Sequence, residues 1–222
     1  FLGVTPGTKT VVIRKMDDGS LNYFIARGRD IYLGDPDVAP ATNPEVSAAI
    51  RATVDGSGVA AGNTLAEYGI KYLFVKNPAP ESLVRTIDGL GGYVRNSATT
   101  DGITWRVVGN TDRLVFTSVT GGVAALPTNE ISSNFTTSSE GTVRLAENYD
   151  RSWQMINNGK LVKKYRNGNG LPEFKIEEAG DYLLIHDGTA RRGWLSLQFI
   201  VFLSCIVMAL PGGRRKRDRA MP

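Results

Sequence analysis

The chain has 222 residues, of which 41% are hydrophobic and one is a cysteine, and its formal net charge is +4. Five of its 26 basic residues and one of its 22 acidic residues lie at 214–219, so the rest of the chain is charge-balanced. The balanced body lacks the basic excess typical of proteins that bind a phosphate backbone, and the single cysteine excludes an internal disulfide, so we expect no nucleic-acid partner and a fold held by its core.

The first residues predict a β-hairpin. β-rich runs at 10–14 and 21–27 flank a turn at 17–19, where two aspartates precede a glycine. The chain opens on Phe1 without a signal-like apolar segment, and we therefore expect it to be a fragment of a longer protein.

Helices and strands alternate in the region that follows. Asn43, Pro44 and Glu45 supply an N-cap, a first-turn proline and a first-turn acid, which predict the start of a helix. A second helix is expected to end at Gly69, which suits a left-handed cap. The further elements expected are a strand at 71–76, a helix at 80–90 and strands at 93–96 and 104–108. This alternation predicts a small α/β layered domain over residues 1–110.

The pattern changes to strands and turns after about residue 111. Turn signals at 157–159 and 167–170 separate short β-rich runs. The runs lie at 114–119, 142–149, 152–156, 161–165, 173–176 and 181–186. They predict an antiparallel β-sandwich domain over residues 111–190, and the fold class expected for the whole chain is α+β.

An apolar run precedes the basic C-terminal tail. Residues 193–213 contain no charge and would span roughly 30 Å as a helix, about the thickness of a bilayer's hydrocarbon layer. We expect a transmembrane helix at 191–213, since the alternative, a helix buried in a soluble core, is seldom so uniformly apolar. Trp194 suits the outer interface. Basic residues anchor the cytoplasmic tail at 214–222, namely Arg214, Arg215, Lys216 and Arg217.

Two aspartates form the best metal-binding pattern in the chain. Asp35 and Asp37 make an Asp-x-Asp that can hold a divalent cation on a diphosphate. Pro36 and Gly34 between and before them are equally typical of a turn, in which aspartate bonds its own backbone. We therefore keep both only as weak metal candidates and expect no cofactor.

Acidic and aromatic side chains alternate with one another at 146–153, where the sequence is AENYDRSW. Glu147 and Asp150 can accept hydrogen bonds from sugar hydroxyls, while Tyr149 and Trp153 can stack on a pyranose. The alternative is that the acids belong to a strand end and turn and that Trp153 fills the sandwich core. These four residues are the carbohydrate-binding candidates.

His186 is the only histidine, so any serine, histidine and aspartate relay must include it. It ends a predicted strand, and no nucleophile elbow accompanies it, which favours a loop or strand-edge role. We assign no catalytic residue, and whether the chain acts in an enzyme stays open.

Three passages, at 27–40, 65–95 and 143–162, carry a resemblance to a known family. The second contains the run YGIKYL and the third contains AENYDRSW followed by an Asn-Gly turn. Together they resemble the C-terminal extracytoplasmic region of large multi-pass actinobacterial membrane proteins described as family 2 glycosyltransferases of the cell envelope. The resemblance implies that the catalytic domain lies upstream on the cytoplasmic side, so that no catalytic residue maps onto this chain.

The function expected is that of a noncatalytic extracytoplasmic accessory domain of a membrane-bound glycosyltransferase in cell-envelope polysaccharide synthesis. It would be held in the bilayer by the last helix and would contact glycan or a partner protein. The alternative is a membrane-anchored structural or interaction protein of the envelope that binds no sugar.

Overall fold

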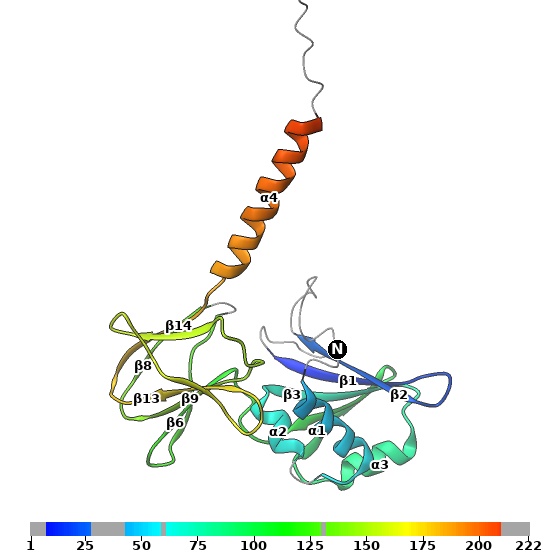
Figure 1. Ribbon diagram of the computed structural model, residues 1–222. Coiled ribbons are helices and arrows are strands. Elements are labelled where there is room, and N and C mark those ends of the chain that lie inside the picture. The colour runs from blue at the N-terminus through cyan, green and yellow to red at the C-terminus, as the bar shows by residue number, and fades with distance from the viewer. Residues whose placement is uncertain (1–7, 28–42, 59–60, 130–131, 210–222) are drawn as a thin grey trace, which may run out of the picture. The chain divides into compact units, whose positions relative to one another are not determined.

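The computed structural model of the chain describes residues 8–27, 43–58, 61–129 and 132–209. The chain divides into two compact units, Phe1–His186 and Asp187–Pro222. The described residues form four helices and three mostly antiparallel sheets (Figure 1). The α+β class expected from the sequence is confirmed.

The first sheet has five strands in the order β2-β1-β3-β5-β4. Its strands are β1 (Lys9–Lys15), β2 (Leu21–Arg27), β3 (Ile70–Lys76), β4 (Tyr93–Ala98) and β5 (Gly102–Val107). Only β1 and β3 run parallel, and the other neighbours are antiparallel. The hairpin expected at the start is confirmed as β1 and β2, with Gly19 in the turn at a φ of 83°.

Three helices cover one face of this sheet (Figure 1). They are α1 (Pro44–Asp55), α2 (Ala61–Glu67) and α3 (Glu81–Gly89). The predicted N-cap is confirmed, because the Asn43 side chain accepts hydrogen bonds from the backbone N–H groups of Glu45 and Val46. Gly69 has a φ of 73°, as expected for the residue that ends the second helix.

Residues 114–186 form two antiparallel sheets around a second core. One sheet has the order β11-β10-β14-β8 and the other β12-β13-β9-β6-β7. Their strands are β6 (Leu114–Ser118), β7 (Val123–Ala125), β8 (Ser132–Thr137), β9 (Gly141–Leu145), β10 (Trp153–Asn157), β11 (Lys160–Leu161), β12 (Lys164–Arg166), β13 (Pro172–Ile176) and β14 (Gly180–His186). Buried side chains from both sheets meet in one cluster, which is how the two layers of a sandwich pack.

Two runs differ from the sequence expectation. The run at 142–149 is a strand only as far as Leu145, because the chain then leaves the sheet into a loop. The run at 161–165 is divided between the two sheets: the N–H of Val162 donates to Met155, whereas Lys163 accepts from the N–H of Lys175. The strands β7 and β8 were not predicted.

The α/β part and the two-sheet part share packing. Leu171, in the connection between β12 and β13, has no exposed surface and belongs to the core beneath α1, α2 and α3. The Asn169 side chain donates to Glu67 at 2.7 Å across the same boundary. The domain boundary expected at residue 110 stays a prediction, and these contacts tie the segments on its two sides together.

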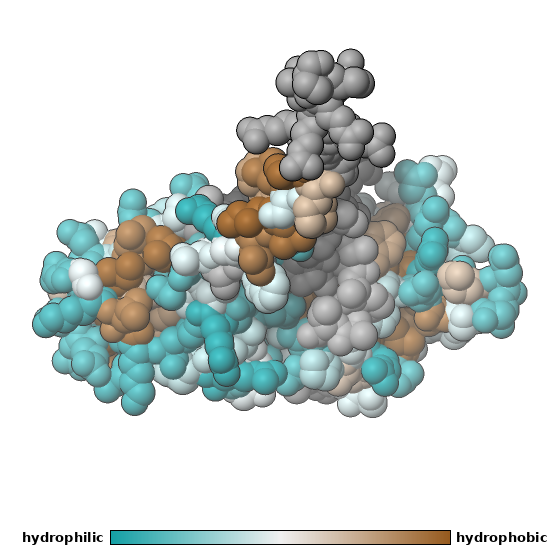
Figure 2. All heavy atoms as spheres, turned by 45° about the horizontal axis from the view of Figure 1, so that its top comes forward, coloured by the Kyte–Doolittle hydropathy of each residue, from teal (hydrophilic) through white to brown (hydrophobic). Residues whose placement is uncertain are grey.

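The last helix, α4 (Thr189–Ala209), exposes large apolar side chains from Trp194 to Met208, and Figure 2 shows hydrophobic side chains on the molecule's surface. Within the part of the chain that the structure describes, no helix is long and apolar enough to cross a membrane.

Candidate functional site

The loop at 146–152 joins β9 to β10 and carries three of the four carbohydrate-binding candidates, with the fourth directly after it. Its beginning is tied to the sheet next to it, since the N–H of Ala146 donates to the carbonyl oxygen of Arg113 at 2.8 Å. The N–H of Glu147 then donates to Leu145, only two residues back, at 2.8 Å. This tight bend turns the Glu147 side chain away from the β9 ladder.

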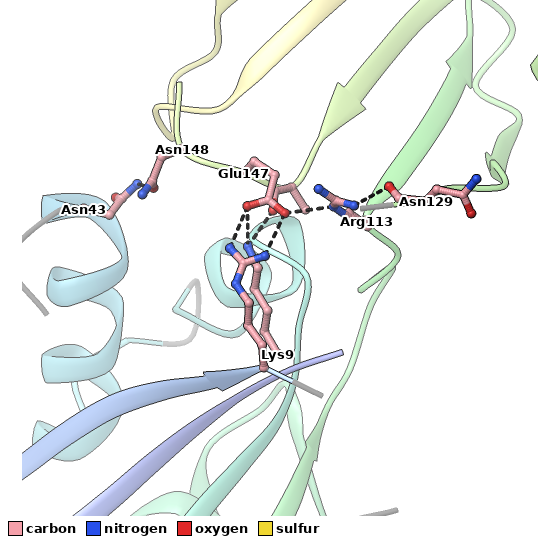
Figure 3. Close-up of polar contacts among 8 residues, drawn as sticks. Lys9, Asn43, Arg113, Asn129, Glu147 and Asn148 are labelled. Atoms are coloured by element: carbon pink, nitrogen blue, oxygen red, sulfur yellow. Dashed lines mark hydrogen bonds and ion pairs between the residues drawn. The ribbon is translucent and has the colours of Figure 1, made fainter. Parts of the chain in front are cut away.

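Glu147 is buried and surrounded by cations from β1, β2 and the segment just before β6 (Figure 3). Its carboxylate accepts from Arg27 at 2.8 and 3.2 Å and from Nε of Arg113 at 2.8 Å. Nζ of Lys9 lies 3.4 Å from the same carboxylate and donates to the carbonyl oxygen of Ala146 at 2.6 Å. We call Lys9, Arg27, Arg113 and Glu147 the junction cluster, because it joins the start of β1 and the end of β2 to the loop at 146–152.

Two opposing effects act on the Glu147 carboxyl. Burial alone would raise its pKa, because a low-dielectric environment disfavours the charged form. The charges of Lys9 and Arg27, the hydrogen bond from Arg27 and the charge of Arg113 outweigh burial and hold the pKa of Glu147 well below its usual range. Glu147 is therefore ionised at neutral pH and cannot act as a general acid there.

A second contact joins the loop to a helix start. The Asn43 side-chain amide donates to Oδ1 of Asn148 at 2.7 Å, while its oxygen caps α1 (Figure 3). Arg113 in turn donates to the carbonyl oxygen of Asn129 at 2.6 Å. The loop is thus held at both Glu147 and Asn148 by elements distant in the sequence.

Trp153 lies in the core of the two-sheet part and is only 8% exposed. Its ring meets the His186 ring edge-on at a centroid distance of 4.8 Å, and the Arg113 guanidinium lies 5.6 Å from its centroid. Stacking of Trp153 on a sugar needs an exposed ring face, so the structure favours the core alternative for this residue.

Asp150 and Tyr149 lie at the surface beside Lys164. Nζ of Lys164 donates to the carbonyl oxygens of Asp150 at 2.8 Å, Arg151 at 3.1 Å and Trp153 at 2.7 Å, and lies 5.2 Å from the Tyr149 ring centroid. Burial lowers the pKa of Lys164, against the charge of Asp150. The backbone at 150–153 therefore turns around the amino group of Lys164. Tyr149 is 38% exposed, so part of its ring is accessible to solvent.

Asp150 bonds its own turn. Its Oδ1 accepts from the N–H of Ser152 at 2.9 Å, and this bond is the main reason that the pKa of Asp150 lies below its usual range. Its Oδ2 lies 3.7 Å from Nε2 of His186, which is the last residue of β14, an inner strand of its sheet. Both contacts are those of a turn aspartate, although the carboxylate remains exposed enough to meet a ligand.

The four candidates do not form one open aromatic surface. Trp153 and Glu147 are buried, whereas Tyr149 and Asp150 are exposed, and sugar binding by the latter pair stays a prediction. A depression of about 430 Å³ lies at the opposite end of β10, lined in part by Asn157 and Tyr182, and none of the four candidates lines it.

The other candidates lie partly outside the described residues. Asp35 and Asp37 belong to the segment 28–42, and Arg214, Arg215, Lys216 and Arg217 belong to 210–222, so their roles stay predictions. Trp194 lies on α4 and is 67% exposed. Among the residues described, no three His, Cys, Asp or Glu side chains gather where they could hold a metal ion.

Sequence reasoning missed Lys9, Arg27, Arg113 and Lys164. The partners of the first three in the junction cluster are 34 to 138 residues away in the chain, and no local pattern marks them. Comparison of the chain with protein-family models, with curated proteins and with solved structures gave no match in any of the three.

Proposed function

We propose that this chain is the noncatalytic, extracytoplasmic accessory part of a membrane-bound family 2 glycosyltransferase of the cell envelope. The C-terminal helix holds it in the bilayer, with the basic tail in the cytoplasm and residues 1–190 outside. There it contacts the growing glycan or a neighbouring envelope protein.

The apolar surface of α4 carries this proposal. Its large hydrophobic side chains between Trp194 and Met208 are 43% to 77% exposed, which is costly in water and favourable in lipid. The uncharged run of the sequence continues from the described helix to Gly213, and Arg214 and the basic residues beyond it suit the cytoplasmic side.

Two observations support an accessory rather than a hydrolytic role. The Glu147 carboxylate is buried and its oxygens accept from Arg27 and Arg113, so it is not presented to a substrate as the carboxyl groups of a glycoside hydrolase must be. The resemblance of 65–95 and 143–162 to the extracytoplasmic end of envelope glycosyltransferases points to the same address.

Fractionation of actinobacterial cells that produce the full chain tests the proposal. The protein should sediment with membranes, resist alkaline washing and dissolve in detergent. Replacing Ile200→Arg and Leu203→Arg should release it, because each charge costs about 2.5–3.5 kcal/mol at the centre of a membrane helix. Leu161→Arg is the matched control, since Leu161 is 68% exposed on β11 and its substitution should leave the protein in the membrane.

Two results would overturn the proposal. One is recovery of the unaltered chain in the soluble fraction without detergent, and the other is retention of the doubly substituted helix in the membrane. Protease added to intact cells should digest residues 1–190 and spare the tail, and the reverse pattern would contradict the orientation.

A membrane-anchored structural protein without sugar contact is the second candidate. The burial of Trp153 and Glu147 favours it, because both candidates are withdrawn from solvent. Tyr149→Ala separates the two functions at this loop. It should weaken binding of envelope oligosaccharides if the loop contacts glycan, and the unaltered chain should bind none if the second candidate is right.

A further inference from the structure

The charged residues of the five-stranded sheet are all of one sign. Its five strands contain eight basic residues and no acidic residue. The side of the sheet toward α1, α2 and α3 is apolar, with Val11, Ile13 and Leu73 in the core. Because successive side chains of a strand point to opposite faces, the alternate residues form a second face that no described helix of this unit covers.

Cross-strand pairing shows how that second face is built. Its middle row contains Phe24, Val12 and Phe74, since Val12 pairs with both aromatic residues. One neighbouring row contains Tyr72 paired with Arg106. We call this surface the open sheet face. Its residues are Arg14 and Asn22 in the first row, Phe24, Val12, Phe74 and Thr104 in the second, Ala26, Thr10, Tyr72, Arg106 and Val94 in the third, and Lys76 beside the first row opposite Gly102. Thr10 and Thr104 are buried, so the accessible part of the face lies at the side chains around them.

The aromatic side chains of this face are accessible. Phe24 is 37% exposed on the edge strand β2, and Tyr72 and Phe74 are half-buried. The Phe74 ring lies over Gly102, where a Cβ would come within 2.7 Å of two ring atoms. The glycine therefore lets the ring lie along the sheet, and the open sheet face presents flat apolar area between polar groups.

Three cations lie on the open sheet face. Arg14, Lys76 and Arg106 are exposed, and none of them forms an ion pair with any residue that the structure describes. They flank the aromatic row on both sides, Arg14 and Lys76 on one and Arg106 on the other. A ligand that matches this surface has apolar ring faces and carries negative charge at intervals.

We propose that the open sheet face binds an acidic polysaccharide, whose pyranose rings stack on Phe24 and Phe74 and whose carboxylate or phosphate groups pair with Arg14, Lys76 and Arg106. The inference rests on the proposed function and names the ligand class and the surface for it. Sugar C–H groups pack on aromatic faces, and guanidinium groups bind carboxylates and phosphates with two parallel hydrogen bonds.

Single-stranded nucleic acid shares the features of rings and negative charge. The proposed function places the sheet outside the cytoplasm and beside a glycan, which favours a polysaccharide over a nucleic acid. The chain before residue 214, with this sheet included, is also charge-balanced, whereas nucleic-acid-binding domains are basic as a whole. We therefore choose the glycan and make nucleic acid an outcome of the test.

The test titrates the full chain in detergent with three probes: polygalacturonic acid, uncharged dextran and a single-stranded oligo(dT). Polygalacturonic acid should bind more tightly than dextran, and its binding should weaken with added salt, which screens exposed ion pairs. The combined variant Arg14→Ala, Lys76→Ala and Arg106→Ala should raise its Kd about tenfold, the effect of three exposed ion pairs.

The matched control removes three positive charges elsewhere, by Arg85→Ala, Lys160→Ala and Lys163→Ala. This control variant has the same net charge as the first triple variant, yet it should bind polygalacturonic acid as tightly as the unaltered chain does. Phe24→Ala should weaken binding of the same probe at unchanged thermal stability, with Leu161→Ala as the control for loss of an exposed apolar side chain.

Equal Kd values for the two triple variants would overturn the inference, since binding would then follow net charge alone. Tighter binding of oligo(dT) than of polygalacturonic acid would overturn it in favour of nucleic acid. Membrane fractionation is independent of these titrations, so a soluble protein that still binds polygalacturonic acid through this face would contradict the anchor and not the surface.

Discussion

The junction cluster and the open sheet face both gather three basic side chains, yet they differ in everything that decides their role. In the junction cluster Lys9, Arg27 and Arg113 surround the buried Glu147. On the open sheet face three cations are exposed and have no acid beside them in the five strands.

This difference teaches that charge and residue type do not by themselves identify a binding site. Burial strengthens the contacts between the Glu147 carboxylate and the cations around it. The junction cluster is therefore structural, because removing one partner of a buried ion pair destabilises the fold. An exposed cation contributes little to stability, and it remains available to a ligand. Substitutions in the two regions should therefore affect different measurements.

The largest expected effect is on the junction cluster. Glu147→Gln keeps the shape of the side chain but removes the buried negative charge that Lys9, Arg27 and Arg113 contact, and should lower the free energy of unfolding by about 3–5 kcal/mol. Denaturant unfolding of the full chain measures it, with Glu140→Gln at an exposed position as control. Binding of polygalacturonic acid should be unchanged in folded Glu147→Gln, and a stability loss below about 1 kcal/mol would contradict a structural role.

The same carboxyl predicts a pH dependence. Because its folded pKa is depressed below the unfolded value, near 4.5, its stabilisation is present above that pH and is lost as pH falls toward the folded value. The stability difference between the unaltered chain and Glu147→Gln should therefore be constant near neutral pH and shrink below about pH 4.5. Denaturant unfolding of both proteins at neutral pH and below about pH 4.5 measures this. The same stability difference at both pH values would contradict an ionised Glu147.

A smaller effect is expected at the contact between loop and helix. Asn43→Ala removes the N-cap of α1 and the bond to Asn148, and should cost about 1–2 kcal/mol. Asn148→Ala removes only the bond between the two side chains and should cost about 1 kcal/mol or less. The difference between the two variants measures the cap, and equal losses would mean that the cap contributes nothing.

The smallest effect is expected on the open sheet face. The triple substitution of Arg14, Lys76 and Arg106 by alanine should change the free energy of unfolding by no more than about 0.5 kcal/mol per site, because exposed side chains without partners contribute little. Thermal and denaturant unfolding check this. A large loss would show that these cations belong to the fold, as those of the junction cluster do.

Elements with a strong local signal were predictable. The hairpin of β1 and β2 follows from β-rich runs around a turn glycine, and α1 begins where Asn43 caps it. β8 was missed because it begins with Ser-Ser-Asn, residues typical of turns, and β7 because VAA is only three residues long. The strand expected to reach 149 stops at Leu145, since Glu147 bends out of the ladder to meet its cations.

The candidate site was predictable only in part. The residue types at 147–153 suggested a polar and aromatic surface, and their order along the chain gave no information on burial. Trp153 was drawn into the core of the two sheets, and Glu147 into a junction whose cations lie on β1, β2 and the segment before β6. Such partners are far apart in sequence, so only the folded chain brings them together.

By itself the sequence determined the local elements, the change from alternating helices and strands to strands alone, and the uncharged run before the basic tail, because turn residues, caps and hydrophobic periodicity act over a few neighbours. The tertiary structure decided which charges are buried with a partner and which stay exposed. Glu147 and Arg106 are both charged residues that follow or lie within β-rich runs. Burial, which depends on packing between distant segments, makes Glu147 a structural ion and leaves Arg106 exposed.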